Sequence, residues 1–211
     1  MNDAGQRLAM FPLGSVLFPR AGLALRVFEP RYRALLSDCL ANDVAEFGVV
    51  LIERGHEVGG GDARFGFGTV ARIVAVGEVA PGVFGVEAVG GRRVRVGQWV
   101  TEDPYPVALT EHVAELVFDD ARDGPAFAAA ERQVRRALTL RAELDESTWP
   151  ATVELDAEPV VAAWQLASIT PVGPMDQLRL LEEPDMASML ALLGRLTEEE
   201  CEALASRLAW G

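Results

Sequence analysis

The chain has 211 residues, of which 50% are hydrophobic and 24% charged, a composition typical of a globular protein that buries a sizeable core. Its net charge of −13 makes nucleic acid a poor partner, because an acidic surface repels phosphate groups. Every basic side chain is an arginine, so these residues can form neither a Walker A loop, nor a Ser-Lys dyad, nor a lysine Schiff base.

The first 118 residues are rich in glycine and valine and are predicted to form a β-rich subdomain. We expect strands at 8–13, 23–28, 46–53, 68–80, 83–89, 92–100 and 106–113. The glycine-rich segment around His56 is expected to be a long hairpin connection that leaves the imidazole exposed. Several strands at such short spacing indicate a small twisted barrel or sandwich.

One helix interrupts these strands at the sequence FEPRYR, which begins at Phe28. The stretch allows a catalytic cluster or a strand-to-helix junction, and we favour the junction. Pro30 suits a first helical turn, and the charge of Glu29 complements the positive end of the helix dipole. Arg31 falls on the wet face, and Tyr32 begins an apolar stripe at helical spacing that continues through Leu35, Leu36, Cys39 and Leu40. Phe28 then ends the preceding strand.

The sequence RRVRV holds the densest group of basic residues in the β-rich subdomain. Its alternation predicts that Arg93 and Arg95 share the outer face of a strand, while Val94 and Val96 face inward. A solvated strand face is the favoured interpretation, and an RNA-binding patch is the alternative.

The pattern changes to helices after residues 119–124, an acidic segment that we interpret as a linker. Residues 125–211 are predicted to form an all-helical subdomain, with helices at 125–144, 158–169 and 174–182, around 186–193 and at 201–209. Thr197 and Glu200 have the spacing of a capping box, which predicts that the last helix starts there.

The sequence contains none of the common catalytic, metal-binding or cofactor-binding motifs for which we searched. Cys39 and Cys201 lie in no C-x-x-C unit, and both fall on apolar helix faces, so we expect buried, unpaired thiols. No G-x-S-x-G, H-E-x-x-H or dinucleotide-binding glycine motif appears. The sequence therefore predicts a non-enzyme with no metal and no cofactor. It also shows neither a signal-peptide pattern nor an apolar run of about 20 residues, so we expect a cytoplasmic protein that does not contact membranes.

The motifs resemble, in order, those of the Lon protease N-terminal substrate-binding domain. The matching segments are MFPLGSVLFPRAGLALRVFEPRYR, FGVVLIE, GTVARIVAV, VEAVGGRRVRV and the helical tail WQLASITPVGPMDQLRLLE. The resemblance implies a PUA-like twisted β-pseudobarrel with one inserted helix, followed by a helical bundle. In Lon, this domain helps to recognise unfolded proteins, and ATPase and protease modules follow it. This sequence contains neither module, so the chain looks like a stand-alone domain, and a peptidase label would come from the family name alone.

We therefore expect a non-catalytic module that binds unfolded or extended polypeptide. Apolar side chains at a barrel mouth or cleft would make the contacts, and the candidates are Phe18, Phe65, Phe67 and Trp99. The alternative for each of them is a place in the core. The alternative function is RNA binding, by analogy with other PUA-like folds, and the acidic charge argues against it. The oligomeric state is left open.

Overall fold

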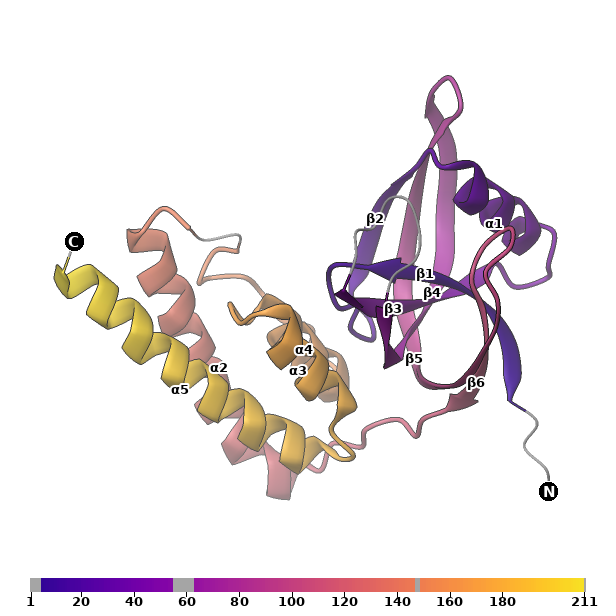
Figure 1. The fold of residues 1–211 in the computed structure, drawn as a ribbon. Coiled ribbons are helices and arrows are strands. Elements are labelled where there is room, and N and C mark those ends of the chain that lie inside the picture. The colour runs from indigo at the N-terminus through magenta and orange to yellow at the C-terminus, as the bar shows by residue number, and fades with distance from the viewer. Residues whose placement is uncertain (1–4, 55–62, 147–148, 211) are drawn as a thin grey trace. The chain divides into compact units, whose positions relative to one another are not determined.

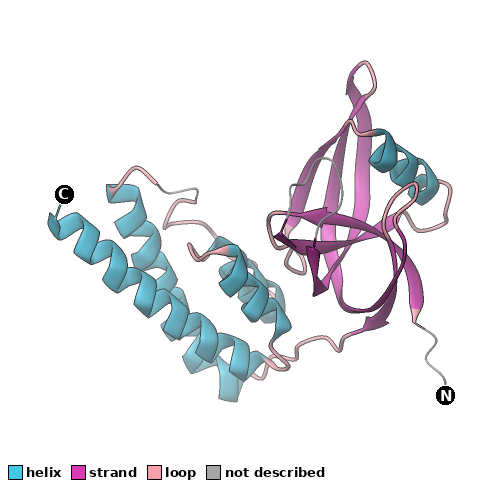
Figure 2. Cartoon of the chain, in the orientation of Figure 1, coloured by secondary structure: helices cyan, strands magenta, loops and turns pink. Residues whose placement is uncertain are grey.

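The computed structural model describes residues 5–54, 63–146 and 149–210 (Figure 1). The chain divides into two compact units, Met1–Glu115 and Leu116–Gly211, which we call the β-rich unit and the helical unit. Strands and helices separate almost completely between them (Figure 2). Among the described residues, no helix is both long enough and apolar enough to cross a bilayer.

A single six-stranded sheet with the strand order β2-β5-β4-β3-β1-β6 forms the β-rich unit. Its elements are β1 (Gln6–Leu13), β2 (Gly22–Val27), α1 (Pro30–Leu40), β3 (Glu46–Arg54), β4 (Ala63–Ala80), β5 (Val83–Thr101) and β6 (Val107–His112). β1 and β3 are parallel, and the other pairs are antiparallel. An additional β5–β6 pairing closes the sheet into the predicted pseudobarrel. The connection expected around His56 falls in 55–62, outside the described residues.

β5 is one continuous strand where the sequence predicted two. Its first part pairs with β2, and its second part pairs with β6. The change of partner occurs near Gly90, where a Cβ atom would collide with the carbonyl oxygen of Phe18. The register against β4 shifts between Thr69 and Ala71, which places a bulge in β5 at this point. The glycines that suggested a break therefore allow a bend and a close approach.

Helix α1 covers one side of the core of the β-rich unit. Its buried residues are Tyr32, Leu35, Leu36 and Cys39, as the apolar stripe predicted. The Tyr32 ring stacks on Phe11 with 4.0 Å between centroids, and Phe11 also contacts Phe47 at 5.8 Å. These aromatic contacts join α1 to β1 and β3, which fixes the helix against the barrel.

Four helices form the other unit: α2 (Asp120–Glu143), α3 (Pro159–Ile169), α4 (Pro174–Glu182) and α5 (Met186–Trp210). α2 and α5 pack along each other and run in the same direction, as the ion pair between Glu146 and Arg207 near their C-terminal ends shows (Figure 1). Trp164 on α3 and the methionines at the start of α5, Met186 and Met189, are fully buried. The methionines therefore fill the core.

The prediction of a linker at 119–124 is wrong. Asp119 is the N-cap of α2, and its side chain accepts the backbone N–H of Arg122 at 2.9 Å. The fully buried Asp123 accepts the backbone N–H of Asp119, also at 2.9 Å. The acidic residues that suggested a solvated break instead satisfy the first amides of a helix.

The predicted helix start at Thr197 is also wrong, because α5 is continuous through it. Thr197 is fully buried, and its hydroxyl donates to the carbonyl oxygen of Leu193 at 2.7 Å. A threonine at mid-helix can direct its hydroxyl to the preceding turn, which removes the need for a cap. The helix start is marked by Asp185 instead, whose carboxylate accepts the N–H of Ser188 at 2.9 Å.

Candidate functional site

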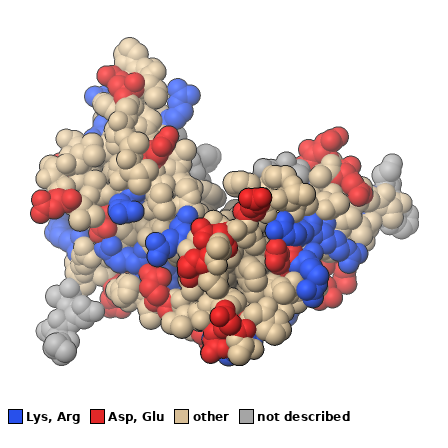
Figure 3. All heavy atoms as spheres, turned by 180° about the vertical axis from the view of Figure 1, so that it is seen from behind, with Lys and Arg blue, Asp and Glu red and all other residues tan. Residues whose placement is uncertain are grey.

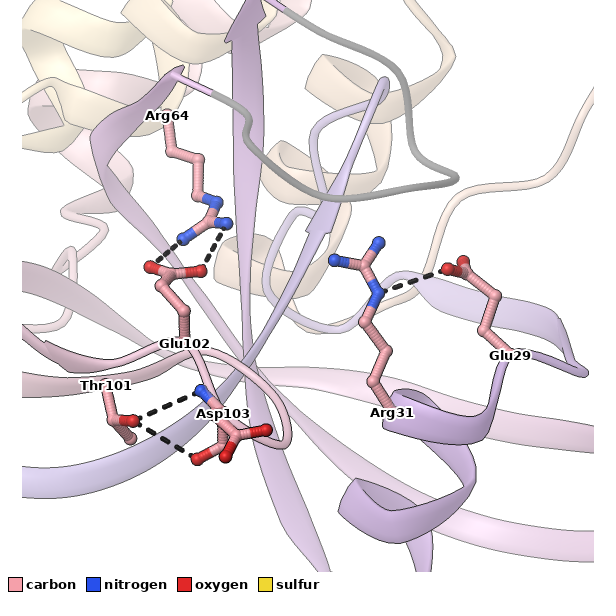
Figure 4. Close-up of polar contacts among 6 residues, drawn as sticks. All are labelled: Glu29, Arg31, Arg64, Thr101, Glu102 and Asp103. Atoms are coloured by element: carbon pink, nitrogen blue, oxygen red, sulfur yellow. Dashed lines mark hydrogen bonds and ion pairs between the residues drawn. The ribbon is translucent and has the colours of Figure 1, made fainter.

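The FEPRYR segment is a structural junction between β2 and α1 (Figure 4). Glu29 is the N-cap residue in extended conformation, and Pro30 occupies the first helical turn. The Arg31 guanidinium pairs with Glu29 at 3.1 Å and lies over the Tyr32 ring at 4.3 Å from its centroid. The polar side chains thus pair with one another at the start of the helix. This arrangement supports the strand-to-helix junction over the catalytic cluster.

Phe28 departs from its predicted role as the last strand residue. β2 ends at Val27, and the Phe28 side chain is 52% exposed. It lines a cavity of about 150 Å³ beside β2, which we call the edge groove. The groove is lined by Phe11, Leu13, residues 24–29 and Tyr32. Its floor is largely apolar, and one exposed aromatic ring stands at its rim.

The four apolar candidates predicted from the sequence differ in solvent exposure: two are buried, and two are half-buried. Phe18 and Phe67 are 1% and 3% exposed, so the prediction that they form an open binding surface is wrong. Phe18 is buried where β5 bends, and Phe67 lies opposite Arg95 on β4, which runs between β3 and β5. Phe65 and Trp99 are half-buried and remain candidates.

Trp99 is packed under a charged side chain. The Arg64 guanidinium lies 4.7 Å from the centre of the Trp99 ring and forms two 2.9 Å hydrogen bonds to Glu102 (Figure 4). Nearby, the hydroxyl of Thr101 exchanges hydrogen bonds with the backbone of Asp103. One face of the indole is therefore covered, which leaves a limited apolar area at this end of the barrel.

Val94 and Val96 face the core as predicted, but the prediction that Arg93 and Arg95 are both solvated is wrong for Arg93. Arg93 is 1% exposed, and its guanidinium donates to the carbonyl oxygen of Ala114 at 2.6 Å. The segment after β6 covers this part of β5, and Val113 N–H donates to the Arg93 carbonyl. The register against β4 is regular from Arg93 to Arg95, so the two side chains lie on one face as predicted, but the returning segment buries Arg93 and leaves Arg95 exposed. Burial lowers the pKa of Arg93 from its usual value.

A second, larger cavity of about 760 Å³ lies between the start of β1, the end of α1 and the β5–β6 connection. Tyr105 donates its phenol proton to Asp38 at 2.6 Å, and Arg92 holds Glu46 with contacts of 2.9 and 2.7 Å. Desolvation, with Asp38, raises the pKa of Tyr105 to about 12. Burial raises the pKa of the Cys39 thiol to about 11. Both groups are thus protonated at neutral pH, and neither is an activated nucleophile.

The arrangement of the described residues provides two cavities that could serve as contact surfaces. In the part of the chain that the structure describes, no group of three histidine, cysteine or acidic side chains is placed to hold a metal ion. On the rear face drawn in Figure 3, basic and acidic side chains are interspersed. The edge groove was missed at the sequence level. The available signal was an unprotected short strand followed by an aromatic residue at a proline-led helix start.

The chain is similar to the substrate-binding domain of Lon proteases. The family model described as the ATP-dependent protease La (LON) substrate-binding domain matches residues 7–199. Lon protease 2 of Sorangium cellulosum is 29% identical over 193 residues, which are 87% of this chain and 24% of that protein. Lon protease 2 of Myxococcus xanthus is 28% identical over 206 residues, which are 96% of this chain and 25% of that protein. The chain thus spans about a quarter of the length of these relatives.

Two solved structures share the fold. The Lon N-terminal domain protein from Xanthomonas campestris is 30% identical, with a TM-score of 0.61, covering 89% of this chain and 96% of that one. The N-terminal domain of Lon protease from the Mycobacterium avium complex is 16% identical, with a TM-score of 0.65, covering 92% and 99%. Both likenesses extend over the β-rich and the helical unit.

Proposed function

The chain belongs to the ATP-dependent protease La (LON) substrate-binding domain family, and from this premise we propose that it binds unfolded or extended polypeptide without cutting it. The single observation that carries the proposal is the edge groove beside β2. An apolar floor with an exposed aromatic rim suits ligands of many sequences, because such binding depends on apolar area more than on fixed polar contacts.

Three aromatic side chains are the proposed contacts. Phe28 stands at the rim of the edge groove with half of its surface exposed. Phe65 and Trp99, retained from the sequence-based candidates, are half-buried. Aromatic rings supply a large contact area at low conformational cost, which fits weak binding without sequence preference.

The non-catalytic part of the proposal rests on the chemistry of the described residues. Both thiols are buried, and burial raises the pKa of each above its usual value. The 211 residues contain no lysine for a Ser-Lys dyad or for a nucleotide-binding loop. The family match covers the substrate-binding domain alone. The RNA alternative loses its predicted patch, because Arg93 is buried.

The test is titration of a fluorescein-labelled model protein that is reduced and alkylated so that it cannot fold. Fluorescence anisotropy should report a Kd of about 10 to 100 μM for the unfolded form and no binding of the folded form. The unfolded protein should also remain intact on gels after incubation. Equal binding of both forms, or binding of neither, would contradict the proposal.

Substitutions then locate the contacts. Phe28→Ser, Phe65→Ser and Trp99→Ser should each raise the Kd by about threefold to tenfold, as expected for losing one partly exposed ring. Met175→Ser is the matched control, because Met175 is 50% exposed and lies in the helical unit. If Met175→Ser weakened binding as much as Phe28→Ser, the edge groove would not be the site.

A further inference from the structure

We infer, building on the proposed function, that polypeptide binds to the edge of β2 as an added strand, and that the preferred segment alternates apolar and acidic side chains. β2 is the last strand in the sheet order, and among the described residues it pairs with β5 alone. A strand paired on one side leaves every second backbone N–H and C=O directed outward, which is a template for another strand.

The sequence of β2 lacks the usual protection of an edge. Natural edge strands are blunted by prolines, bulges, charged side chains or a covering helix or loop. β2 reads GLALRV, with regular pairing to β5 along all six residues and no proline. Its one charge, Arg26, is exposed on the outer face. Among the described residues, β2 therefore carries none of these features except the charge of Arg26.

The two faces of β2 set the pattern that an added strand must carry. Leu23, Leu25 and Val27 face the core, whereas Ala24 and Arg26 are exposed. The edge groove lies on this strand and extends to Phe11 and Tyr32. Because side chains alternate along a strand, every second residue of the ligand would enter the groove, and the residues between would lie beside Ala24 and Arg26.

Charge decides which residues fit on the outer face. Residues 20–33 contain four arginines and one carboxylate, a net charge of +3 in a chain whose total is −13. Arg20, Arg26 and Arg33 are exposed, and the carboxylate of Glu29 is already paired with Arg31. An acidic residue placed opposite Arg26 would be favoured by cross-strand pairing. RNA would also meet these charges, but its backbone has no regularly spaced amides to pair with the edge.

The probe is a fluorescein-labelled peptide, Ser-Val-Glu-Val-Glu-Val-Ser, compared with the same peptide carrying lysine in place of glutamate. The glutamate peptide should bind at least about threefold more tightly at low salt, and the difference should shrink in 0.5 M salt as the Debye length falls to a few ångströms. Equal binding of the two peptides at low salt would overturn the charge assignment.

Backbone pairing has its own diagnostic, which is N-methylation of alternate amides. Two versions of the glutamate peptide are methylated on opposite edges of the strand. One version should bind about tenfold more weakly or worse, and the other should bind like the parent, because one edge alone pairs with β2. If both versions bind like the parent while the unfolded protein still binds, strand addition is wrong and the proposed function stands. If neither peptide nor unfolded protein binds, both fail.

Arg26→Glu completes the test, with Arg132→Glu as the control of equal charge on α2. Arg26→Glu should reverse the preference to the lysine peptide, and Arg132→Glu should leave it unchanged, since Arg132 is exposed in the helical unit. A 12-nucleotide uridine RNA is titrated alongside. RNA binding that is tighter than peptide binding and is lost in Arg26→Glu would assign the edge to nucleic acid and overturn the inference.

Discussion

The two units of the chain differ in net charge and in how their backbone hydrogen-bonding groups are satisfied. Residues 1–115 hold 11 arginines and 14 acidic residues, a net charge of −3, whereas residues 116–211 hold 8 and 18, a net charge of −10. In the helical unit, carboxylates occupy helix starts, where Asp119, Glu158 and Asp185 accept backbone N–H groups. In the β-rich unit, arginines gather around β2, whose outer edge is not paired by any described strand.

The difference shows where the capacity for binding lies. A helix satisfies its own backbone except at its ends, and the acidic caps satisfy those ends. A sheet leaves backbone groups at each edge, and this barrel closes through β5 and β6 while β2 extends beyond the closure. The acidity of the whole chain is therefore mostly a property of the helical unit and does not describe the surface around β2.

The largest expected effect comes from emptying the β-rich core. Phe18→Ala should lower the free energy of unfolding by about 3–5 kcal/mol, because the ring is 1% exposed and its removal leaves a cavity. Phe28→Ala, at 52% exposure, should change it by less than about 0.5 kcal/mol. Urea denaturation followed by circular dichroism measures both. Similar effects would mean that Phe28 is as buried as Phe18.

The next effect separates the two arginines that the sequence predicted to be equivalent. Arg93→Ala should cost about 1–3 kcal/mol, since it removes a buried side chain together with its hydrogen bond to the carbonyl oxygen of Ala114. Arg95→Ala should stay within about 0.5 kcal/mol, because that side chain is exposed. The same denaturation experiment compares them, and a larger cost for Arg95 than for Arg93 would contradict the assignment of Arg93 as the buried one of the two.

A pH-dependent effect is expected at the start of α2. The hydrogen bond from Arg122, the largest cause, holds the pKa of Asp123 below its usual value. A depressed carboxyl pKa stabilises the fold above the unfolded value of about 3.9, and this stabilisation is lost as the pH falls below it. Asp123→Ala should therefore cost about 1 kcal/mol at pH 7 and less at pH 3. A cost that is constant between these pH values would exclude the charge as the cause.

The smallest expected change in stability is at Glu200, which the sequence predicted to be part of a capping box but which lies inside the continuous helix α5. Glu200→Ala should change the free energy of unfolding by less than about 0.5 kcal/mol, because α5 is continuous at that point. Glu158→Ala, which removes an observed N-cap from α3, should cost about 1 kcal/mol. If Glu200→Ala proved the costlier of the two by thermal denaturation, a helix boundary near Thr197 would have to be reconsidered.

Much of the fold could be predicted because its signals are local. Pro30, Pro159 and Pro174 each stand in a first helical turn, and the helices that they begin end within a residue or two of the expected positions. The buried face of α1 followed from apolar spacing alone. Such features depend on residues within about one or two helical turns, so the sequence determined them by itself.

The candidate site could be predicted only in part, because exposure depends on distant chain segments. The burial of Phe18 depends on the bend of β5 at Gly90, and that of Arg93 on a segment that returns after β6. Phe28 looks equally apolar in the sequence, yet it lies outside the core because β2 ends one residue earlier. The sequence by itself determined the order and type of most elements. Only the tertiary structure decided which aromatic and basic side chains reach solvent, because strand pairing and its bulges are non-local.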